Sequence, residues 1–178
     1  MQPPTHYHPA FVPDPAALFT TLRDEVVWDQ RMKARRTASM GEPYDYSQMD
    51  YPRAPWHPLV AALRSGLAPH VGAAPGNCLL NLYPSGASTM GWHADDISAL
   101  APGTGIAIVS LGAARPLLFR RREGGAGRDV TEQILAPGSL LVMSGAMQRE
   151  WQHSLPAAPT SEERMSLTFR CLLRGSPA

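Results

Sequence analysis

Prolines and glycines recur along the whole chain and cut the sequence into short pieces. The 178 residues include 18 prolines and 15 glycines, and we find neither an internal repeat nor a low-complexity tract. After Gly72 the pieces bounded by Gly, Pro or Ser have the texture of short strands. The expected strands are 77–83, 106–111, 116–121, 130–136, 139–144 and 165–173. This pattern predicts an antiparallel sandwich or barrel as the core.

Two helices are expected before these strands. The first starts at Asp14, a good N-cap, with Pro15 at the favoured first helical position and an apolar stripe at helical spacing: Leu18, Phe19, Leu22 and Val26. The second follows Trp56-His57-Pro58 and is expected to stop at Gly66. Residues 32–55 between them are polar, aromatic and turn-rich, and we expect hairpins and loops there. Helices followed by a run of strands predict an α+β fold.

Size and composition favour one globular domain over residues 1–178, with 44% apolar residues. The formal net charge of +1 means that the whole protein is not an electrostatic binder of nucleic acid, although it allows a local basic strip. Cys78 and Cys171 are too few for a disulfide framework or a thiolate zinc site. We see no secretion signal and no apolar run near the roughly 18 residues that span a bilayer. We therefore expect a protein of the reducing cytoplasm that does not contact membranes.

A candidate metal site lies in the sequence Gly-Trp-His-Ala-Asp-Asp. His93 and Asp95 are two residues apart, so in a strand they present an imidazole and a carboxylate on the same face. Asp96 faces the other way or lies in the following loop. His153, in WQHSLP, is the best candidate for a third ligand from another strand. Two histidines and one carboxylate form the facial triad of non-haem Fe(II) oxygenases. The alternative is a turn with incidental polar residues and a surface histidine.

Two expected strands separate polar from apolar side chains by face. In NCLLNLY, Asn81 and Tyr83 share one face, and in RMSLTFR one face carries Arg164, Ser166, Thr168 and Arg170. If both arginines point inward they need an anion, because an unpaired buried charge is very costly. A dicarboxylate ligand would supply it, since guanidinium pairs with carboxylate through two hydrogen bonds. The alternative is a solvated face of an edge strand.

The order of these motifs resembles the AlkB family of Fe(II)- and 2-oxoglutarate-dependent dioxygenases, which repair alkylated nucleobases. The resemblance extends from about residue 7 to residue 174 and rests on NLYPSGASTMGWHADD, SLGAARPLLFR, GSLLVMSG, WQHSLP and RMSLTFR. It implies a double-stranded β-helix, or jelly roll, with N-terminal helices that buttress one sheet. It also implies a nucleotide-recognition lid at about residues 30–55.

The resemblance also assigns residues to roles. The iron ligands would be His93, Asp95 and His153. Arg170 matches the arginine that pairs with the distal carboxylate of 2-oxoglutarate and Arg164 the one near its other end. The remaining cosubstrate positions match Asn81, Tyr83 and Ser166, where the family usually has Asn at the last of these. Substrate contacts are expected from Asp96 and the lid residues Tyr44 and Tyr46, and from Arg115 to phosphate. The alternatives are a cross-strand stack for the tyrosines and a solvated strand end for Arg115.

The activity that the resemblance implies is oxidative demethylation of nucleobases such as N1-methyladenine and N3-methylcytosine. This reaction uses Fe(II) and O2 and couples to decarboxylation of 2-oxoglutarate to succinate. Single-stranded DNA or RNA is expected in preference to duplex, because Ile97 follows the Asp-Asp pair where duplex-acting members usually carry an acidic residue. We expect a monomer. The alternatives are a dioxygenase of the same fold acting on a protein or small molecule, and a catalytically silent nucleic-acid-binding module.

Overall fold

The fold is described from a computed structural model, which covers residues 2–45, 49–122 and 129–173. Within these ranges the chain forms helices and strands in the following order: β1 (Thr5–His8), α1 (Pro15–Glu25), β2 (Arg36–Gly41), α2 (Pro58–Val71), β3 (Asn77–Tyr83), β4 (Met90–His93), β5 (Gly105–Gly112), β6 (Arg115–Arg121), β7 (Thr131–Leu135), β8 (Leu140–Ser144), α3 (Met147–Glu150), β9 (Trp151–Leu155) and β10 (Arg164–Arg170). None of the described helices is both long and apolar enough to cross a membrane.

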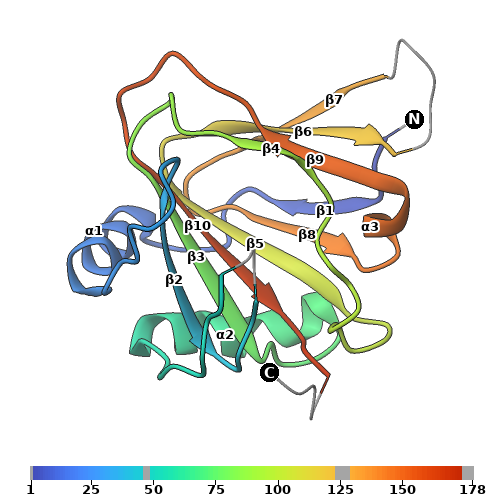
Figure 1. The fold of residues 1–178 in the computed structure, drawn as a ribbon, viewed down its shortest axis with the longest axis horizontal. Helices are drawn as coiled ribbons and strands as arrows, with labels where there is room; N and C mark the ends of the chain where they lie inside the picture. The colour runs from blue at the N-terminus through green and yellow to red at the C-terminus, as the bar shows by residue number, and fades with distance from the viewer. Residues whose placement is uncertain (1, 46–48, 123–128, 174–178) are drawn as a thin grey trace.

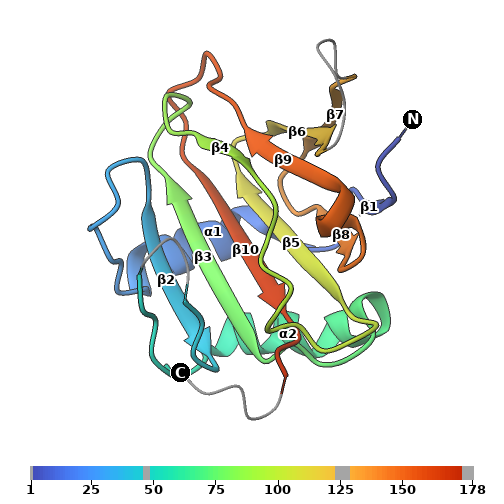
Figure 2. The same ribbon diagram turned by 45° about the vertical axis from the view of Figure 1, so that its right-hand side comes forward.

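The strands form two antiparallel sheets that face each other (Figures 1 and 2). The larger sheet has the strand order β1-β8-β5-β10-β3-β2, and the smaller one has the order β4-β9-β6-β7. Most neighbours in these lists, such as β8 and β1 or β10 and β3, are distant in sequence, because the chain crosses repeatedly from one sheet to the other, whereas β6 and β7 follow each other along the chain. This arrangement is the double-stranded β-helix, and it confirms the expected α+β jelly-roll class.

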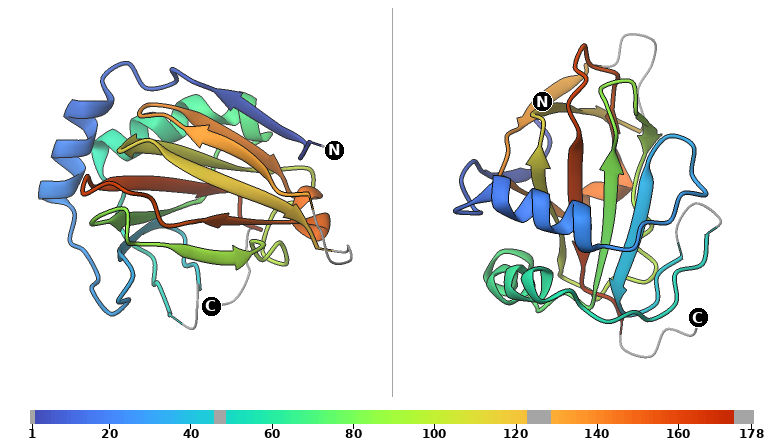
Figure 3. Two further views of the ribbon diagram at one scale, coloured as in Figure 1. Left: turned by 90° about the horizontal axis from the view of Figure 1, so that it is seen from above. Right: turned by 90° about the vertical axis from the view of Figure 1, so that its left-hand side faces the viewer.

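Both long helices pack on the outer face of the larger sheet, on the side away from the smaller sheet (Figure 3). Their buried residues Leu22, Val60 and Leu67 join apolar side chains of the sheet such as Leu80 and Phe169 in one cluster. A second cluster lies between the sheets and includes Ile106, Phe119, Leu141 and Trp151. The face of the larger sheet under the helices is therefore apolar. Its other face, toward the smaller sheet, contributes to the second cluster and is also available for a pocket.

The first helix matches its prediction, and its N-cap explains where it begins. The side chain of Asp14 accepts a hydrogen bond from the backbone N–H of Ala17 at 3.0 Å, and Pro15 is the first helical residue. This satisfies one of the N–H groups that have no partner within the helix. Leu18 and Leu22 from the expected stripe are buried.

The second helix is longer than expected, and the predicted stop at Gly66 is wrong. Helix α2 continues through Gly66 and Pro69 to Val71 and ends at Gly72, which adopts a left-handed φ of 94°. The Gly72 N–H closes the last turn on the carbonyl of Ala68 at 3.0 Å. Burial of Leu67 and Val71 after Gly66 stabilises the extension, so packing outweighs the low helix propensity of glycine.

Part of the segment expected to be hairpin and loop is a strand. Residues Arg36–Gly41 form β2, which pairs antiparallel with β3 at the edge of the larger sheet. Strands β1, β4 and β9 were also not among the expected strands, whereas the six predicted ones are present with shifts of a few residues at their ends. The missed strands are short or polar, so neither length nor alternation marks them.

Candidate active site

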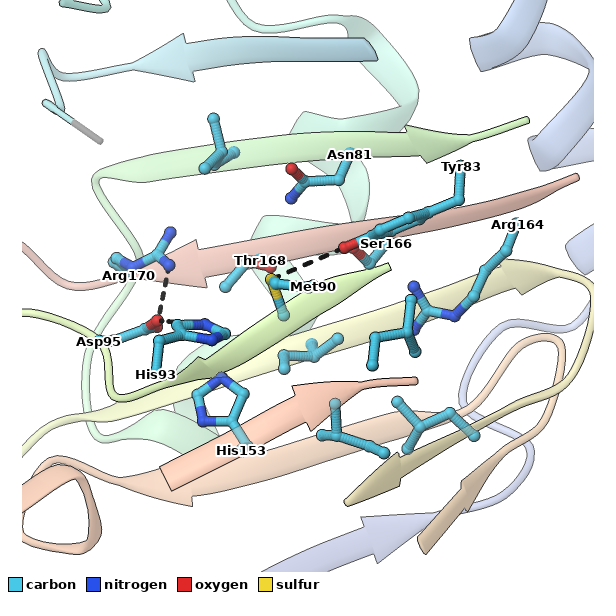
Figure 4. A pocket seen from close by; sticks show the side chains of 15 residues that line it. Asn81, Tyr83, Met90, His93, Asp95, His153, Arg164, Ser166, Thr168 and Arg170 are labelled. Atoms are coloured by element: carbon cyan, nitrogen blue, oxygen red, sulfur yellow. Dashed lines mark hydrogen bonds and ion pairs between the residues drawn. The ribbon is translucent and has the colours of Figure 1, made fainter. Parts of the chain in front are cut away.

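His93, Asp95 and His153 come together as a candidate metal centre. Each offers one ligand atom, and these atoms all lie within 4.8 Å of one another. His93 ends strand β4 and pairs directly with His153 on β9, and their ring centroids are 4.2 Å apart. Asp95 lies just beyond the strand rather than within it, which corrects the expectation that one strand presents both ligands. The chain turns after His93 and still places the Asp95 carboxylate 3.7 Å from His93 Nε2 (Figure 4).

Hydrogen bonds fix the orientation of two of these ligands. The Nδ1 atom of His93 lies 2.9 Å from the carbonyl oxygen of Gly91, and because a carbonyl only accepts, Nδ1–H is the donor. This leaves the Nε2 lone pair available for a metal ion. The backbone N–H of Asp95 donates to Gln148 Oε1 at 3.0 Å, which holds the turn that carries the carboxylate.

Burial and nearby charges set the protonation states of the triad. Burial, reinforced by His93, lowers the pKa of His153 to about 4, so its imidazole is neutral at pH 7. Burial alone would raise the pKa of Asp95, but the positive charge of Arg170 together with the two imidazoles outweighs it and lowers that pKa. A neutral imidazole and an ionised carboxylate are the forms that bind metal ions. The donor set therefore fits Fe(II).

A pocket between the two sheets extends from this centre (Figure 4). Its lining includes the predicted polar faces of two neighbouring strands of the larger sheet: Asn81 and Tyr83 from β3, and Arg164, Ser166, Thr168 and Arg170 from β10. The opposite faces of these strands, with Leu80, Leu82 and Leu167, pack in the apolar cluster under the helices. The polar faces therefore point inward, as the first of the two interpretations of these strands requires.

Arg164 is a buried cation that faces this pocket. It is 2% exposed, and its Nη2 donates to Ser110 Oγ at 3.0 Å. Within the described part of the chain its Nε atom has no hydrogen-bond partner. Burial lowers the pKa of Arg164 to about 10, which still leaves it charged at pH 7. Such a group fits a carboxylate of 2-oxoglutarate, because an anion would compensate the buried charge.

The two arginines occupy opposite ends of β10, in the reverse of the expected order. Arg170 Nη2 donates to Asp95 Oδ2 at 2.9 Å, so Arg170 lies at the metal end. Arg164 lies at the other end of the strand, with its guanidinium carbon 5.4 Å from the centroid of the Tyr83 ring. The geometry therefore does not support the expected placement of Arg170 at the distal carboxylate, since Arg170 contacts a predicted iron ligand and Arg164 is the arginine remote from the triad. The alternation along a strand predicts that both arginines share one face. It does not predict which of them lies nearer the triad, because that depends on how the other sheet packs against the strand.

The predicted substrate residues Asp96 and Tyr44 differ in their exposure to solvent. Asp96 is exposed beside the triad, and its Oδ1 accepts from the Ser98 N–H at 2.8 Å. Tyr44 is buried, and its ring centroid lies 4.4 Å from the guanidinium carbon of Arg170. Tyr46 lies outside the described residues. The tyrosine at position 44 therefore packs over the metal-end arginine.

Arg115 is not placed to contact a substrate phosphate, which corrects that expectation. Its side chain is fully buried, with 0% exposure. It donates to three backbone carbonyls, those of Ser85, Ser88 and Pro156. The physical reason is that the carbonyls of two loops converge on this position, so the guanidinium ties the loops together.

Two residues that the sequence analysis did not name also contact the site. Arg35 Nε donates to Asn81 Oδ1 at 2.8 Å across 46 residues of chain, and Gln148 holds the Asp95 turn across 53 residues. Arg35 lies in a run of basic residues and Gln148 in a short polar helix. No local pattern distinguishes either from a surface residue, because the fold alone creates both contacts.

Comparison with known proteins agrees with this geometry. The family model described as 2OG-Fe(II) oxygenase superfamily matches residues 15–170. The alpha-ketoglutarate-dependent dioxygenase alkB homolog 3 of Bos taurus is 36% identical over 85% of this chain and 55% of its own length. The protein of the same name from Homo sapiens is 34% identical over 89% and 58%. The DNA oxidative demethylase ALKBH2 of Mus musculus is 34% identical over 78% and 62%.

The chain thus spans less than two thirds of the length of these relatives. The matched region nevertheless contains the triad, both strands that carry the polar faces, and the two arginines. The chain belongs to the 2OG-Fe(II) oxygenase superfamily and, within it, to the AlkB family.

Proposed function

We propose that this protein demethylates N-alkylated nucleobases by oxidation, with N1-methyladenine and N3-methylcytosine as typical lesions. The reaction converts the methylated base, 2-oxoglutarate and O2 into the free base, formaldehyde, succinate and CO2. The observation that carries the proposal is the single pocket that joins the His93, Asp95 and His153 triad to the buried cation of Arg164. The names of the relatives, a DNA oxidative demethylase among them, support the substrate class.

The residues at the two ends of the pocket would have different roles: those at one end would bind the metal ion, and Arg164 at the other end would bind the cosubstrate. When bound, Fe(II) with 2-oxoglutarate and O2 supplies the oxidising chemistry. His93, Asp95 and His153 would hold the metal ion from one side, which leaves the opposite positions for other ligands. Arg164 would pair with the distal carboxylate, and Arg170 keeps Asp95 ionised and in place. Asn81 and Tyr83 would donate hydrogen bonds to the cosubstrate between these ends.

The methylated base would enter from the side of Asp96. A base must leave its stack to reach a buried site, and enzymes hold it there by aromatic contact and hydrogen bonds to its polar edge. The exposed Asp96 carboxylate beside His93 is a suitable acceptor for an exocyclic amine. Residues 30–55 would serve as the lid over the nucleotide. Single strands are the proposed substrate, because they spare the cost of opening a duplex, and the proposed active form is a monomer.

The test uses one methylated sequence in three forms: single-stranded DNA, duplex DNA and RNA. Each is incubated with the protein, Fe(II), 2-oxoglutarate and ascorbate, and the demethylated base is measured by mass spectrometry beside formaldehyde. We expect the most product from a single strand and none from the His93→Ala or Asp95→Ala variants. Absence of demethylation in every form would contradict the proposal. Succinate formed only with a protein or small molecule would instead assign the site to another substrate.

A further inference from the structure

Arg35, in the segment expected to be the lid, contacts Asn81, a residue that lines the pocket. It precedes strand β2, its side chain is 8% exposed, and its Nε donates to Asn81 Oδ1 at 2.8 Å. Asn81 lies within β3, is 5% exposed, and pairs in register with Ser166 of β10 on the polar face. A buried charged group thus meets a buried amide at the edge of the pocket.

The chemistry of this contact fixes the orientation of the amide. A guanidinium group has only donors, so Asn81 must present its oxygen to Arg35. The other end of the amide, the NH2 group, then points into the pocket, as Figure 4 shows. An NH2 group donates to the oxygens of a keto acid, whereas an amide oxygen in the same position would repel them. The direction of the Asn81 amide therefore decides whether it attracts or repels the cosubstrate.

The lid segment is anchored at the same place. Thr37, two residues after Arg35, lies 2.6 Å from the Tyr51 hydroxyl through its own hydroxyl, so the outgoing and returning parts of the segment are joined there. Strand β2 pairs with β3 along its whole length, from Arg36 opposite Leu82 to Gly41 opposite Asn77. This pairing holds the backbone that directly follows Arg35 against β3, with Thr37 opposite Asn81. The contact is consequently part of an ordered edge and not of a loose loop.

We propose that Arg35 is a positioning residue for the cosubstrate, which acts through Asn81 by holding its NH2 group toward the pocket. The inference rests on the proposed function, because it assumes that 2-oxoglutarate occupies this pocket. It assigns part of the cosubstrate site to the segment expected to be the lid. Loss of Arg35 would then weaken cosubstrate binding without removing any group that touches the cosubstrate.

The experiment measures 2-oxoglutarate binding by calorimetry in the presence of Mn(II), so that no turnover is required. We expect Arg35→Met to raise the dissociation constant about tenfold, the effect of one hydrogen bond to a charged group. Arg35→Lys, which retains a donor, should recover part of this loss. Arg36→Met changes the exposed neighbour of Arg35, the first residue of β2, and should leave the constant unchanged. In turnover assays the KM for 2-oxoglutarate should rise more than kcat falls.

A double variant separates positioning from a general structural effect. If Arg35 acts through Asn81, Arg35→Met should add no further loss of affinity when Asn81 is already alanine. An equal loss in both backgrounds, or unchanged binding in Arg35→Met, would overturn the inference. If Arg35→Met does not fold, the comparison of Arg35→Lys in the two backgrounds decides the question in the same way. A wild-type protein that binds no 2-oxoglutarate would overturn the proposed function itself, and with it this inference.

Discussion

The two carboxylate oxygens of Asp95 have different partners. His93 lies 3.7 Å from one of its oxygens, and Arg170 donates to the other at 2.9 Å. Asp95 is 8% exposed, so without Arg170 burial would favour its neutral form. The arginine therefore keeps the carboxylate ionised before any metal ion arrives, and it uses one of the two oxygens to do so. The other oxygen stays directed at the histidines.

The low pKa of His153 makes the stability of the metal-free protein depend on pH. Burial and His93 lower the pKa of His153 to about 4, below its ordinary value of 6.5. Between these values the unfolded chain binds a proton at this histidine that the folded chain does not. The free energy of unfolding should therefore have its full value above pH 6.5. It should fall as the pH drops toward 4, by up to about 1.4 kcal/mol per pH unit.

Urea unfolding of the metal-free protein at pH 7, 6 and 5 would measure this slope. His153→Gln removes the titrating group and should flatten the slope, whereas His70→Gln at an exposed position should keep it. An identical slope in the His153 variant would contradict the assignment.

Arg115 has a structural role that a substitution would reveal. Its guanidinium is the donor to the carbonyls of Ser85, Ser88 and Pro156. Arg115→Met leaves these carbonyls without their charged donor, so we expect the free energy of unfolding to fall by about 2–4 kcal/mol. The affinity for a single-stranded oligonucleotide and its salt dependence should not change in protein that remains folded. A lower salt slope would instead indicate a phosphate contact.

At the scale of elements, the sequence predicts best where two faces differ. Strands β3 and β10 alternate polar and apolar residues, and their inward polar faces are the predicted ones. Strand β9 carries His153 in a polar sequence, and β2 lies in a turn-rich segment, so neither has a pattern of its own. Their positions come from pairing with neighbours. The same reason explains the reversed arginines and the unforeseen Arg35 contact, since both depend on how distant strands meet.

Gly66 inside helix α2 and Gly72 at its C-cap test the corrected end of that helix. Gly66 lies in the exposed helix interior, and a Cβ there would meet Phe11 at 3.8 Å, an ordinary contact. Gly66→Ala should therefore raise the free energy of unfolding by about 0.5–1 kcal/mol. Gly72 has a φ of +94°, which L-residues rarely adopt, so Gly72→Ala should lower it by about 1 kcal/mol. Thermal unfolding of both variants measures the difference. If Gly66→Ala were the more destabilising change, the helix would end at Gly66.

At the scale of the whole molecule, the candidate active site is divided between the sheets. Histidines 93 and 153 come from the smaller sheet, whereas Asn81, Arg164 and Arg170 come from the larger one. A metal ion and a dicarboxylate bound together would therefore link both sheets, and the dicarboxylate would compensate the buried charge of Arg164. Neither sheet alone holds the two sets of groups, so binding should be coupled to the stability of the complete fold.

This coupling predicts a thermal shift that needs both ligands. At 2-oxoglutarate concentrations near 100 times its dissociation constant, with Mn(II) saturating, stabilisation should reach about 2.7 kcal/mol. For a domain of this size that corresponds to a rise in Tm of roughly 5–10 °C. Mn(II) alone should give a smaller rise, and 2-oxoglutarate alone almost none, because the triad and Arg170 complete its site only around a metal ion. Arg164→Met should keep the rise with Mn(II) and lose the additional rise with 2-oxoglutarate. An additional rise that survives in this variant would place the distal carboxylate elsewhere than at Arg164.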